Sequence, residues 1–336
     1  MTLVTHVGRN KKEGRLLLHE AAYHAIVVSC TRFANRNIPN DDWREVYGLM
    51  IGYVDRKTND VVCTECVPMT HTREIGPMLQ VQFEEQDYVD SVLIEDEAAT
   101  RDPPQWVVGW FHSHPGIKIM FTLDDIKTML GWATNNPLAV GLVFNPVRLV
   151  RQIEVGFEKG DKELVNDPGF EVFRLDDPSL GTKSPYHAVE YQIVPPEAGA
   201  KPKPKEQIVR EAQELVFDTI ALLPRDSPLE ALKKYVELSI EKLNSEVAGV
   251  EAYVDRLRRS GEHDRIPNVL KDQRGDVEKL IEARQARIRR GRELIRHVEY
   301  KERAAVESEL PAVLQRWEEL VAGVGPRFDA LAKGAP

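Results

Sequence analysis

The sequence of 336 residues contains little cysteine and no long apolar segment. Three cysteines are too few and too unevenly spaced for a disulfide framework, which indicates a reducing compartment. No apolar run approaches the ~20 residues that a helix needs to cross a bilayer. The apolar stretch after Leu16 is interrupted by His19, Glu20 and His24, so we also expect no signal peptide. These absences predict a cytoplasmic protein without a membrane partner.

An excess of positive charge is also missing, since the formal net charge is −9. Acidic residues outnumber basic ones only in the first 200 residues, and such a region repels nucleic acid and favours a basic partner. The basic run RQARIRRGRELIR lies on an expected helix whose neighbours are rich in glutamate. We interpret it as a solvated or partner-facing helix, with nucleic acid as the less favoured alternative.

A stretch rich in proline and lysine divides the chain. The four prolines of IVPPEAGAKPKPKE cannot continue a helix or a strand, so we place a linker at 194–206, between a domain at 1–193 and a helical region at 207–336. The expected strands are 46–54, 59–67, 79–83, 105–111, 138–144, 150–157 and 187–193. The expected helices are 20–36, 84–98 and 123–134. This mixture predicts an α/β or α+β domain with a central sheet and flanking helices.

The region after the linker shows a heptad pattern typical of an all-α, coiled-coil-like structure. One apolar seam consists of Val236, Ile240, Leu243, Val247, Val250, Val254 and Leu257. A second consists of Val306, Leu310, Val313, Trp317, Leu320 and Val324. Between them the pattern is poorer, with Arg284 and Gly291 at seam positions. A helical hairpin or small bundle is expected, and it could pack on itself or on the helices of a partner.

Two histidines end an apolar strand in the stretch VVGWFHSHPG. Because side chains alternate between the faces of a strand, His112 and His114 point the same way and their rings can converge on one point. The ordinary interpretation is a pair of structural or exposed histidines. The alternative is two nitrogen ligands of a metal ion.

A carboxylate follows at the start of the next expected helix. Thr122 is a candidate N-cap and Asp125 lies in the first turn, so Thr-x-x-Asp can be explained by helix capping alone. Capping does not explain the adjacent His-x-His. Two imidazoles and one carboxylate are a ligand set typical of catalytic zinc, which leaves a fourth position for water.

A hydrolytic zinc site also needs a base for the proton of that water. Glu45 stands directly before the apolar strand at 46–54, where a carboxylate gains nothing from packing. An exposed residue at a strand start is the commoner explanation of such a position. Glu45 is nevertheless our candidate for the base.

These residues together resemble the JAMM (MPN-plus) family of zinc isopeptidases. Glu45 followed by HSHPGIKIMFTLDD is similar to the family signature, an upstream Glu and then His-x-His-Pro-x6-Ser-x-x-Asp. EVYGLMIGYVD and VVGWFHSHPG also look like the corresponding segments of the family's deubiquitinases in the proteasome lid and the signalosome. The resemblance covers roughly residues 14–193, and it implies an MPN/JAMM domain of the cytidine-deaminase-like α/β class with a mixed sheet.

The resemblance implies one Zn²⁺ per chain, with His112, His114 and Asp125 as ligands, Glu45 as general base and the Thr122 hydroxyl as oxyanion stabiliser. The implied substrate is the bond between the C-terminal glycine of ubiquitin, or a ubiquitin-like modifier, and a lysine. The segment Met78, Leu79, Gln80, Val81, Gln82 and Phe83 is expected to bind the modifier's tail by strand addition. The C-terminal helices are expected to join a proteasome or a related complex.

Two departures from the family pattern concern the loop before the helix. Threonine stands at 122 where the family usually has serine, and its extra methyl group stiffens χ1. The usual Cys-Trp pair is also missing from IKIMF. Neither change removes a ligand or the base. Two other functions stay open: a non-catalytic MPN scaffold subunit, and a peptidase for small peptides or sulfur-carrier proteins.

Cys63 and Cys66 form a single Cys-x-x-Cys inside an expected strand. Because positions i and i+3 of a regular strand face opposite sides, we interpret them as two ordinary strand cysteines rather than as a metal or redox site.

Overall fold

The computed structural model describes residues 14–71, 83–149, 152–156, 162–195 and 200–334. The chain divides into two compact units. The first contains the chain up to Ala221 together with the short segment His297–Lys301, and the second contains Leu222–Arg296 and Glu302–Pro336. No helix in the described ranges combines the length and the apolar character that a bilayer crossing requires.

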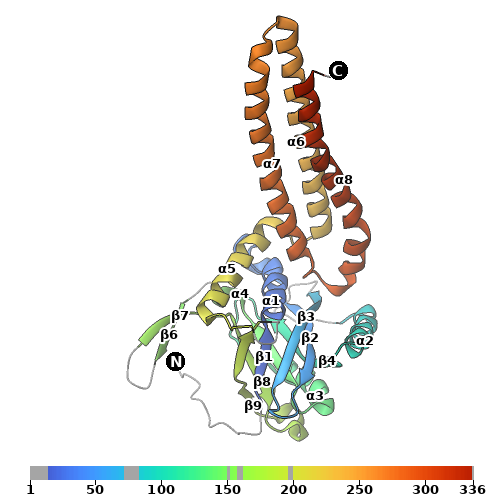
Figure 1. The fold of residues 1–336 in the computed structure, drawn as a ribbon. Helices are drawn as coiled ribbons and strands as arrows, with labels where there is room; N and C mark the ends of the chain where they lie inside the picture. The colour runs from blue at the N-terminus through green and yellow to red at the C-terminus, as the bar shows by residue number, and fades with distance from the viewer. Residues whose placement is uncertain (1–13, 72–82, 150–151, 157–161, 196–199, 335–336) are drawn as a thin grey trace. The chain divides into compact units, whose positions relative to one another are not determined.

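The first unit is built on a mixed sheet of eight strands in the order β10-β1-β3-β2-β4-β5-β8-β9 (Figure 1). The strands are β1 (Leu16–His19), β2 (Val46–Val54), β3 (Val61–His71), β4 (Trp106–Ser113), β5 (Val140–Phe144), β8 (Phe170–Leu175), β9 (Tyr186–Ala188) and β10 (Tyr191–Val194). β1 is parallel to β3 and β10, and β4 is parallel to β5; the other pairs are antiparallel. A separate antiparallel pair consists of β6 (Gln152–Gly156) and β7 (Lys162–Asn166).

Helices cover this sheet, as the sequence predicted. The helices of the first unit are α1 (Glu20–Phe33), α2 (Glu85–Ala99), α3 (Leu123–Asn135), α4 (Pro146–Leu149) and α5 (Lys205–Leu222), with 3₁₀ turns η1 (Asn40–Asp42) and η2 (Pro178–Lys183). Buried side chains of α2 and α3, such as Ile94 and Met129, share one apolar cluster with Leu49, Ile51 and Trp110 of the sheet. Burial of this apolar surface fixes both helices on the sheet.

Two sequence expectations need correction. The single strand expected at 187–193 is two strands, because β9 pairs with β8 and β10 pairs with β1 at opposite edges of the sheet. β1, β7 and β8 were not expected. The expected strand at 79–83 lies outside the described residues except for Phe83, which is not in a strand.

The expectation that Cys63 and Cys66 face opposite sides of the strand is also wrong. Cys63 pairs with Gly52 and Glu65 pairs with Ile51, so Thr64 is an extra residue in a β-bulge. The bulge turns Cys63 and Cys66 to the same side, and their sulfur atoms lie 3.7 Å apart. Both thiols are free and buried.

α5 belongs to the first compact unit. The apolar face of α5 is buried and contains Ile208, Val209 and Ala212. Gln213 of the same helix donates a hydrogen bond to the carbonyl oxygen of Leu149 at 2.8 Å. This packing explains why α5 groups with the sheet.

The second unit is helical, as predicted. It comprises α6 (Pro228–Ser260), the short turn η3 (His263–Arg265), α7 (Ile266–Ile295) and most of α8 (Tyr300–Lys333), and α6 and α7 lie side by side (Figure 1). All members of the first seam except Ile240 are buried, as are Leu310, Val313, Trp317 and Val324 of the second. Glycine at position 291 leaves room for α6, because a Cβ there would lie 2.8 Å from a methyl carbon of Leu232.

Candidate metal centre

His112 and His114 lie where β4 ends. His112 is in register with Tyr47 of β2 and Val143 of β5, and the His114 amide donates a hydrogen bond to the Phe144 carbonyl at 2.7 Å. Both imidazoles are almost fully buried. The two rings converge, with 2.9 Å between their Nε2 atoms. The expectation that these two side chains point the same way is therefore confirmed.

Asp125 reaches the same point from the first turn of α3. Thr122 is the N-cap, and a reciprocal capping box joins the two residues. The Thr122 amide donates to Asp125 Oδ2 at 2.6 Å, and the Asp125 amide donates to Thr122 Oγ1 at 3.2 Å. Asp125 therefore takes part in the cap of α3 and also lies beside the two imidazole rings, because the cap holds its carboxylate there.

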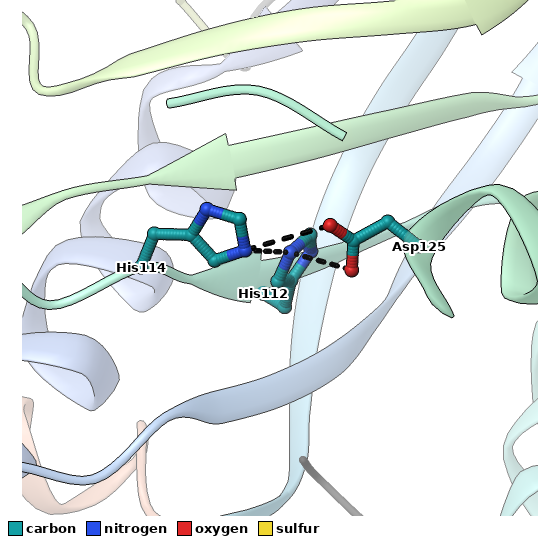
Figure 2. Close-up of side chains that lie close together, drawn as sticks. All are labelled: His112, His114 and Asp125. Carbon is teal, nitrogen blue, oxygen red and sulfur yellow. Dashed lines mark hydrogen bonds and ion pairs between the residues drawn. The ribbon is translucent and has the colours of Figure 1, made fainter. Parts of the chain in front are cut away.

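The three side chains form one compact set of donor atoms (Figure 2). Asp125 Oδ1 lies 3.1 Å from His112 Nε2, and Oδ2 lies 3.5 Å from His114 Nε2. A tetrahedral ion with ligands at ~2.0–2.1 Å requires about 3.3 Å between ligand atoms. The two imidazole nitrogens, at 2.9 Å, lie somewhat closer than this, and each carboxylate oxygen lies near this distance from one of them. The donor atoms are close enough together for one ion, and their chemical type fits zinc. No other such set of His, Cys, Asp and Glu side chains occurs in the described part of the chain.

The charges of the isolated site also suit a cation. Burial alone would raise the pKa of Asp125, but hydrogen bonding with His112 and His114 outweighs it and holds the pKa well below its usual range. Burial lowers the pKa of His112. Burial alone would lower the pKa of His114, but hydrogen bonding with Asp125 outweighs this effect and raises the pKa. The aspartate is therefore an anion and His112 is neutral near pH 7, as metal ligands need to be, whereas a proton on His114 has to leave before this ring can bind a metal.

Glu45 is buried, with only 5% of its surface exposed, contrary to the ordinary expectation for a strand start. The strand that follows it is tied to the histidine segment, because the Val46 amide donates to Ser113 Oγ at 2.9 Å. Burial raises the pKa of Glu45 to about 8; His114 opposes this shift and Asp125 adds to it. A carboxyl group that titrates near neutral pH beside these residues can both accept and return a proton.

Of the expected tail-binding segment, only Phe83 is described. Its ring packs edge-on against Tyr47, with 4.6 Å between centroids, and against Tyr88 at 5.4 Å. Met78–Gln82 lie outside the described residues. Sequence reasoning missed Ser113, whose hydroxyl anchors the strand after Glu45, and Trp110, whose ring stacks on His112. The signal for Trp110 was its position two residues before His112 on the same face of the strand.

A match to a protein family covers the part of the chain that contains this site. Residues 16–135, which include all five site positions, match the family model described as JAB1/Mov34/MPN/PAD-1 ubiquitin protease. The chain is 34% identical over 108 residues to the 26S proteasome regulatory subunit rpn11 of Schizosaccharomyces pombe, covering 32% of this chain and 33% of that protein. Identity is 33% over 108 residues, with the same coverage, to the 26S proteasome non-ATPase regulatory subunit 14 of Drosophila melanogaster and to the ubiquitin carboxyl-terminal hydrolase RPN11 of Saccharomyces cerevisiae.

The chain spans about one third of the length of these curated relatives. The family match covers β1 to β4 and α1 to α3, and it includes His112, His114 and Asp125. Residues 16–135 therefore form an MPN domain that matches this family model, as the sequence resemblance implied.

Proposed function

We propose that this protein is a zinc-dependent isopeptidase that releases ubiquitin or a ubiquitin-like modifier from a lysine side chain. The observation that carries the proposal is the convergence of three buried donor atoms, those of His112, His114 and Asp125, beside the buried carboxyl group of Glu45. If the three side chains formed only a structural ion pair, a second buried carboxyl group with a raised pKa would not be needed beside them.

In this proposal His112, His114 and Asp125 hold one zinc ion per chain. Bound there, zinc would supply Lewis acidity, which polarises a carbonyl group and acidifies water. The capping box keeps Asp125 in place before any ion binds, because its Oδ2 already accepts the Thr122 amide hydrogen. This preorganisation reduces the conformational cost of forming the site.

Glu45 moves the proton. Its pKa of about 8 in the isolated protein lies near physiological pH, where transfer to and from a carboxyl group is most effective. We assign Glu45 the acceptance of a proton from the attacking water and its return to the departing lysine amine. The carbonyl carbon of the isopeptide bond is attacked, and its bond to the lysine nitrogen breaks.

Thr122 stabilises the oxygen that becomes negative during attack. Its Oγ1 accepts the Asp125 amide hydrogen, which leaves the hydroxyl hydrogen to donate. A positioned donor of this kind typically contributes 10²–10³ in kcat. Threonine and serine place the same hydroxyl group at this position, so we assign Thr122 the role of the family serine.

The substrate class rests on the names of the relatives, one of which is a ubiquitin carboxyl-terminal hydrolase and others proteasome regulatory subunits. We propose that the modifier's C-terminal tail binds along Met78–Phe83, that the helical unit attaches the protein to a proteasome or a related complex, and that it acts in the cytoplasm. A long helical unit suits assembly with large partners better than a free-standing peptidase.

The decisive experiment measures zinc content and cleavage for the wild type, Glu45→Gln and Asp125→Asn. Glu45→Gln should retain one zinc per chain and the wild-type circular dichroism but lose cleavage of a modifier–lysine conjugate, whereas Asp125→Asn should lose both metal and cleavage. Glu97→Gln, an exposed position on α2, is the matched control and should behave as wild type. Cleavage by Glu45→Gln at the wild-type rate would show that the assigned base is wrong.

The same assay separates the competing functions. A wild-type chain that binds no zinc would indicate a scaffold subunit. A chain that binds zinc and cleaves small peptides, but no modifier conjugate, would indicate a peptidase.

A further inference from the structure

The second ring nitrogens of the two histidines have different surroundings. His114 Nδ1 lies 3.1 Å from the carbonyl oxygen of Lys118, a hydrogen bond that orients its ring. His112 Nδ1 is buried and has no hydrogen-bond partner among the residues that the structure describes. A histidine ligand normally donates this second N–H to a carboxylate, a carbonyl or a water, which fixes the ring. Something else must orient His112.

The indole of Trp110 is in the right place to do so. Its ring stacks on the His112 imidazole, with 4.4 Å between centroids and 12° between planes. Trp110 is itself almost fully buried and stacks with Tyr47, whose centroid is 5.3 Å away, and with Phe121, at 6.1 Å. His112 therefore lies at the end of a packed aromatic layer, which restricts rotation of its ring as a hydrogen bond would.

Trp110 also touches the helix that carries the third donor. Its indole N–H donates to the sulfur of Met129 at 3.4 Å, and Met129 lies one turn of α3 beyond Asp125. A single side chain thus contacts the imidazole of His112 and the helical face below Asp125. The spacing between β4 and α3 at the site depends on this contact.

The neighbouring strand leaves room for this arrangement. A Cβ at Gly141 of β5 would lie 2.5 Å from the ring of Phe121 and 3.1 Å from Trp110 Nε1. Real Cβ atoms essentially never approach another heavy atom at 2.5 Å. Gly141 is therefore required for both rings to lie where they do.

We infer that Trp110 is a positioning residue for the metal centre: its indole sets the plane of the His112 ring and its distance from Asp125, and so controls the affinity for zinc. The inference rests on the zinc centre of the proposed function but not on the proposed substrate. Loss of a group that orients a metal ligand typically weakens binding by 10–100-fold. The same range is expected for loss of this stack.

The test compares Trp110→Leu, Trp110→Phe and Trp317→Leu in the full-length chain. Zinc affinity is measured by competition with a chromophoric chelator, and ligand geometry by the visible absorption of the Co²⁺-loaded protein. Trp110→Leu should weaken zinc binding about 10–100-fold and change the Co²⁺ spectrum. Trp110→Phe keeps an aromatic stack and should recover most of the affinity. Trp317 is equally buried but lies in the helical unit, so Trp317→Leu should lower stability and leave both metal readouts unchanged.

A further measurement on the wild type does not depend on the folding of any variant. Addition of zinc should shift the indole N–H resonance of Trp110 in a ¹⁵N spectrum and leave that of Trp317 in place. Wild-type affinity and an unaltered Co²⁺ spectrum in Trp110→Leu would overturn the inference, as would an indole resonance of Trp110 that zinc does not move. Failure of the wild-type chain to bind zinc would instead refute the proposed metal centre.

Discussion

Arg32 and Glu299 form a buried ion pair, with 2.6 Å between Nη1 and Oε2 and at most 2% of either side chain exposed. They are 267 positions apart in the sequence. The second oxygen of Glu299 lies 3.3 Å from His71 Nδ1. Glu299 belongs to the short segment that joins the first compact unit although the chain on both sides of it belongs to the second. The pair therefore fastens a distant part of the chain to the sheet domain.

We predict that Glu299→Gln lowers the free energy of unfolding of the first unit by about 3–5 kcal/mol, because it leaves the Arg32 charge buried without its carboxylate. Urea unfolding measures the change. Glu246→Gln is the control: Glu246 forms a 2.6 Å pair with Lys242 on the exposed surface of α6, and its loss should cost less than about 0.5 kcal/mol. Equal effects of the two substitutions would contradict the prediction.

The raised pKa of Glu45 predicts that the free energy of unfolding of the metal-free protein decreases as the pH rises. Burial raises this pKa to about 8, above the ordinary value of 4.5. The neutral form is therefore favoured on folding, and the associated stability is complete below pH 4.5 and is lost as the pH rises toward 8. Glu45→Gln, which cannot ionise, should be more stable than the wild type at pH 8 by up to about 4 kcal/mol, with little difference at pH 4.5.

Urea unfolding in the presence of a chelator, at both pH values, tests this difference. Glu97→Gln again provides the control, because its exposed carboxyl group should show no such trend. A Glu45→Gln advantage that does not grow with pH would contradict the assignment of a raised pKa.

Thr122 combines two roles that substitution can separate. Thr122→Ala removes the cap of α3 and should cost about 1 kcal/mol of stability, while the loss of the proposed oxyanion donor should lower kcat by 10²–10³. Thr122→Ser retains the hydroxyl group and should keep both. Thr134→Ala, near the other end of α3, removes a hydroxyl group that donates to the Leu130 carbonyl and should change neither. Full activity of Thr122→Ala would exclude the hydroxyl group from the reaction.

Two glycines of the helical unit should respond differently to alanine. A Cβ at Gly249 of α6 would meet nothing within 4 Å, so Gly249→Ala should stabilise this unit by about 0.5–1 kcal/mol through helix propensity. At Gly291 the new Cβ would approach Leu232 at 2.8 Å, so most of this gain should be lost. Thermal unfolding of the two variants provides the comparison, and equal stabilisation would show that the α6–α7 contact is looser than described.

Features that depend on local periodicity could be predicted from the sequence. The convergence of His112 and His114 followed from the alternation of a strand, and the cap at Thr122 from helix-start chemistry. The buried seam of α6 followed from heptad spacing. In each case neighbouring residues along the chain contain the whole signal.

Features that depend on distant pairing could not be predicted in this way. The side of Cys66 was mistaken because a bulge is defined by the partner strand, not by the strand itself. The burial of Glu45 depends on Ser113 and the histidines, which are more than 60 positions away. The sequence around Glu299 gives no indication of its ion pair, because the counter-ion lies far away on α1.

The path of the chain bears on how this protein can be shortened. A fragment that stops at Ala221 would lack the carboxylate opposite Arg32 and the ring of Tyr300, which packs against the apolar cluster of the sheet. Such a fragment would expose apolar surface and lose the carboxylate paired with Arg32, so it would be prone to aggregate whatever the state of its metal site. A minimal catalytic version should keep His297–Lys301, grafted after α5 through a designed connection.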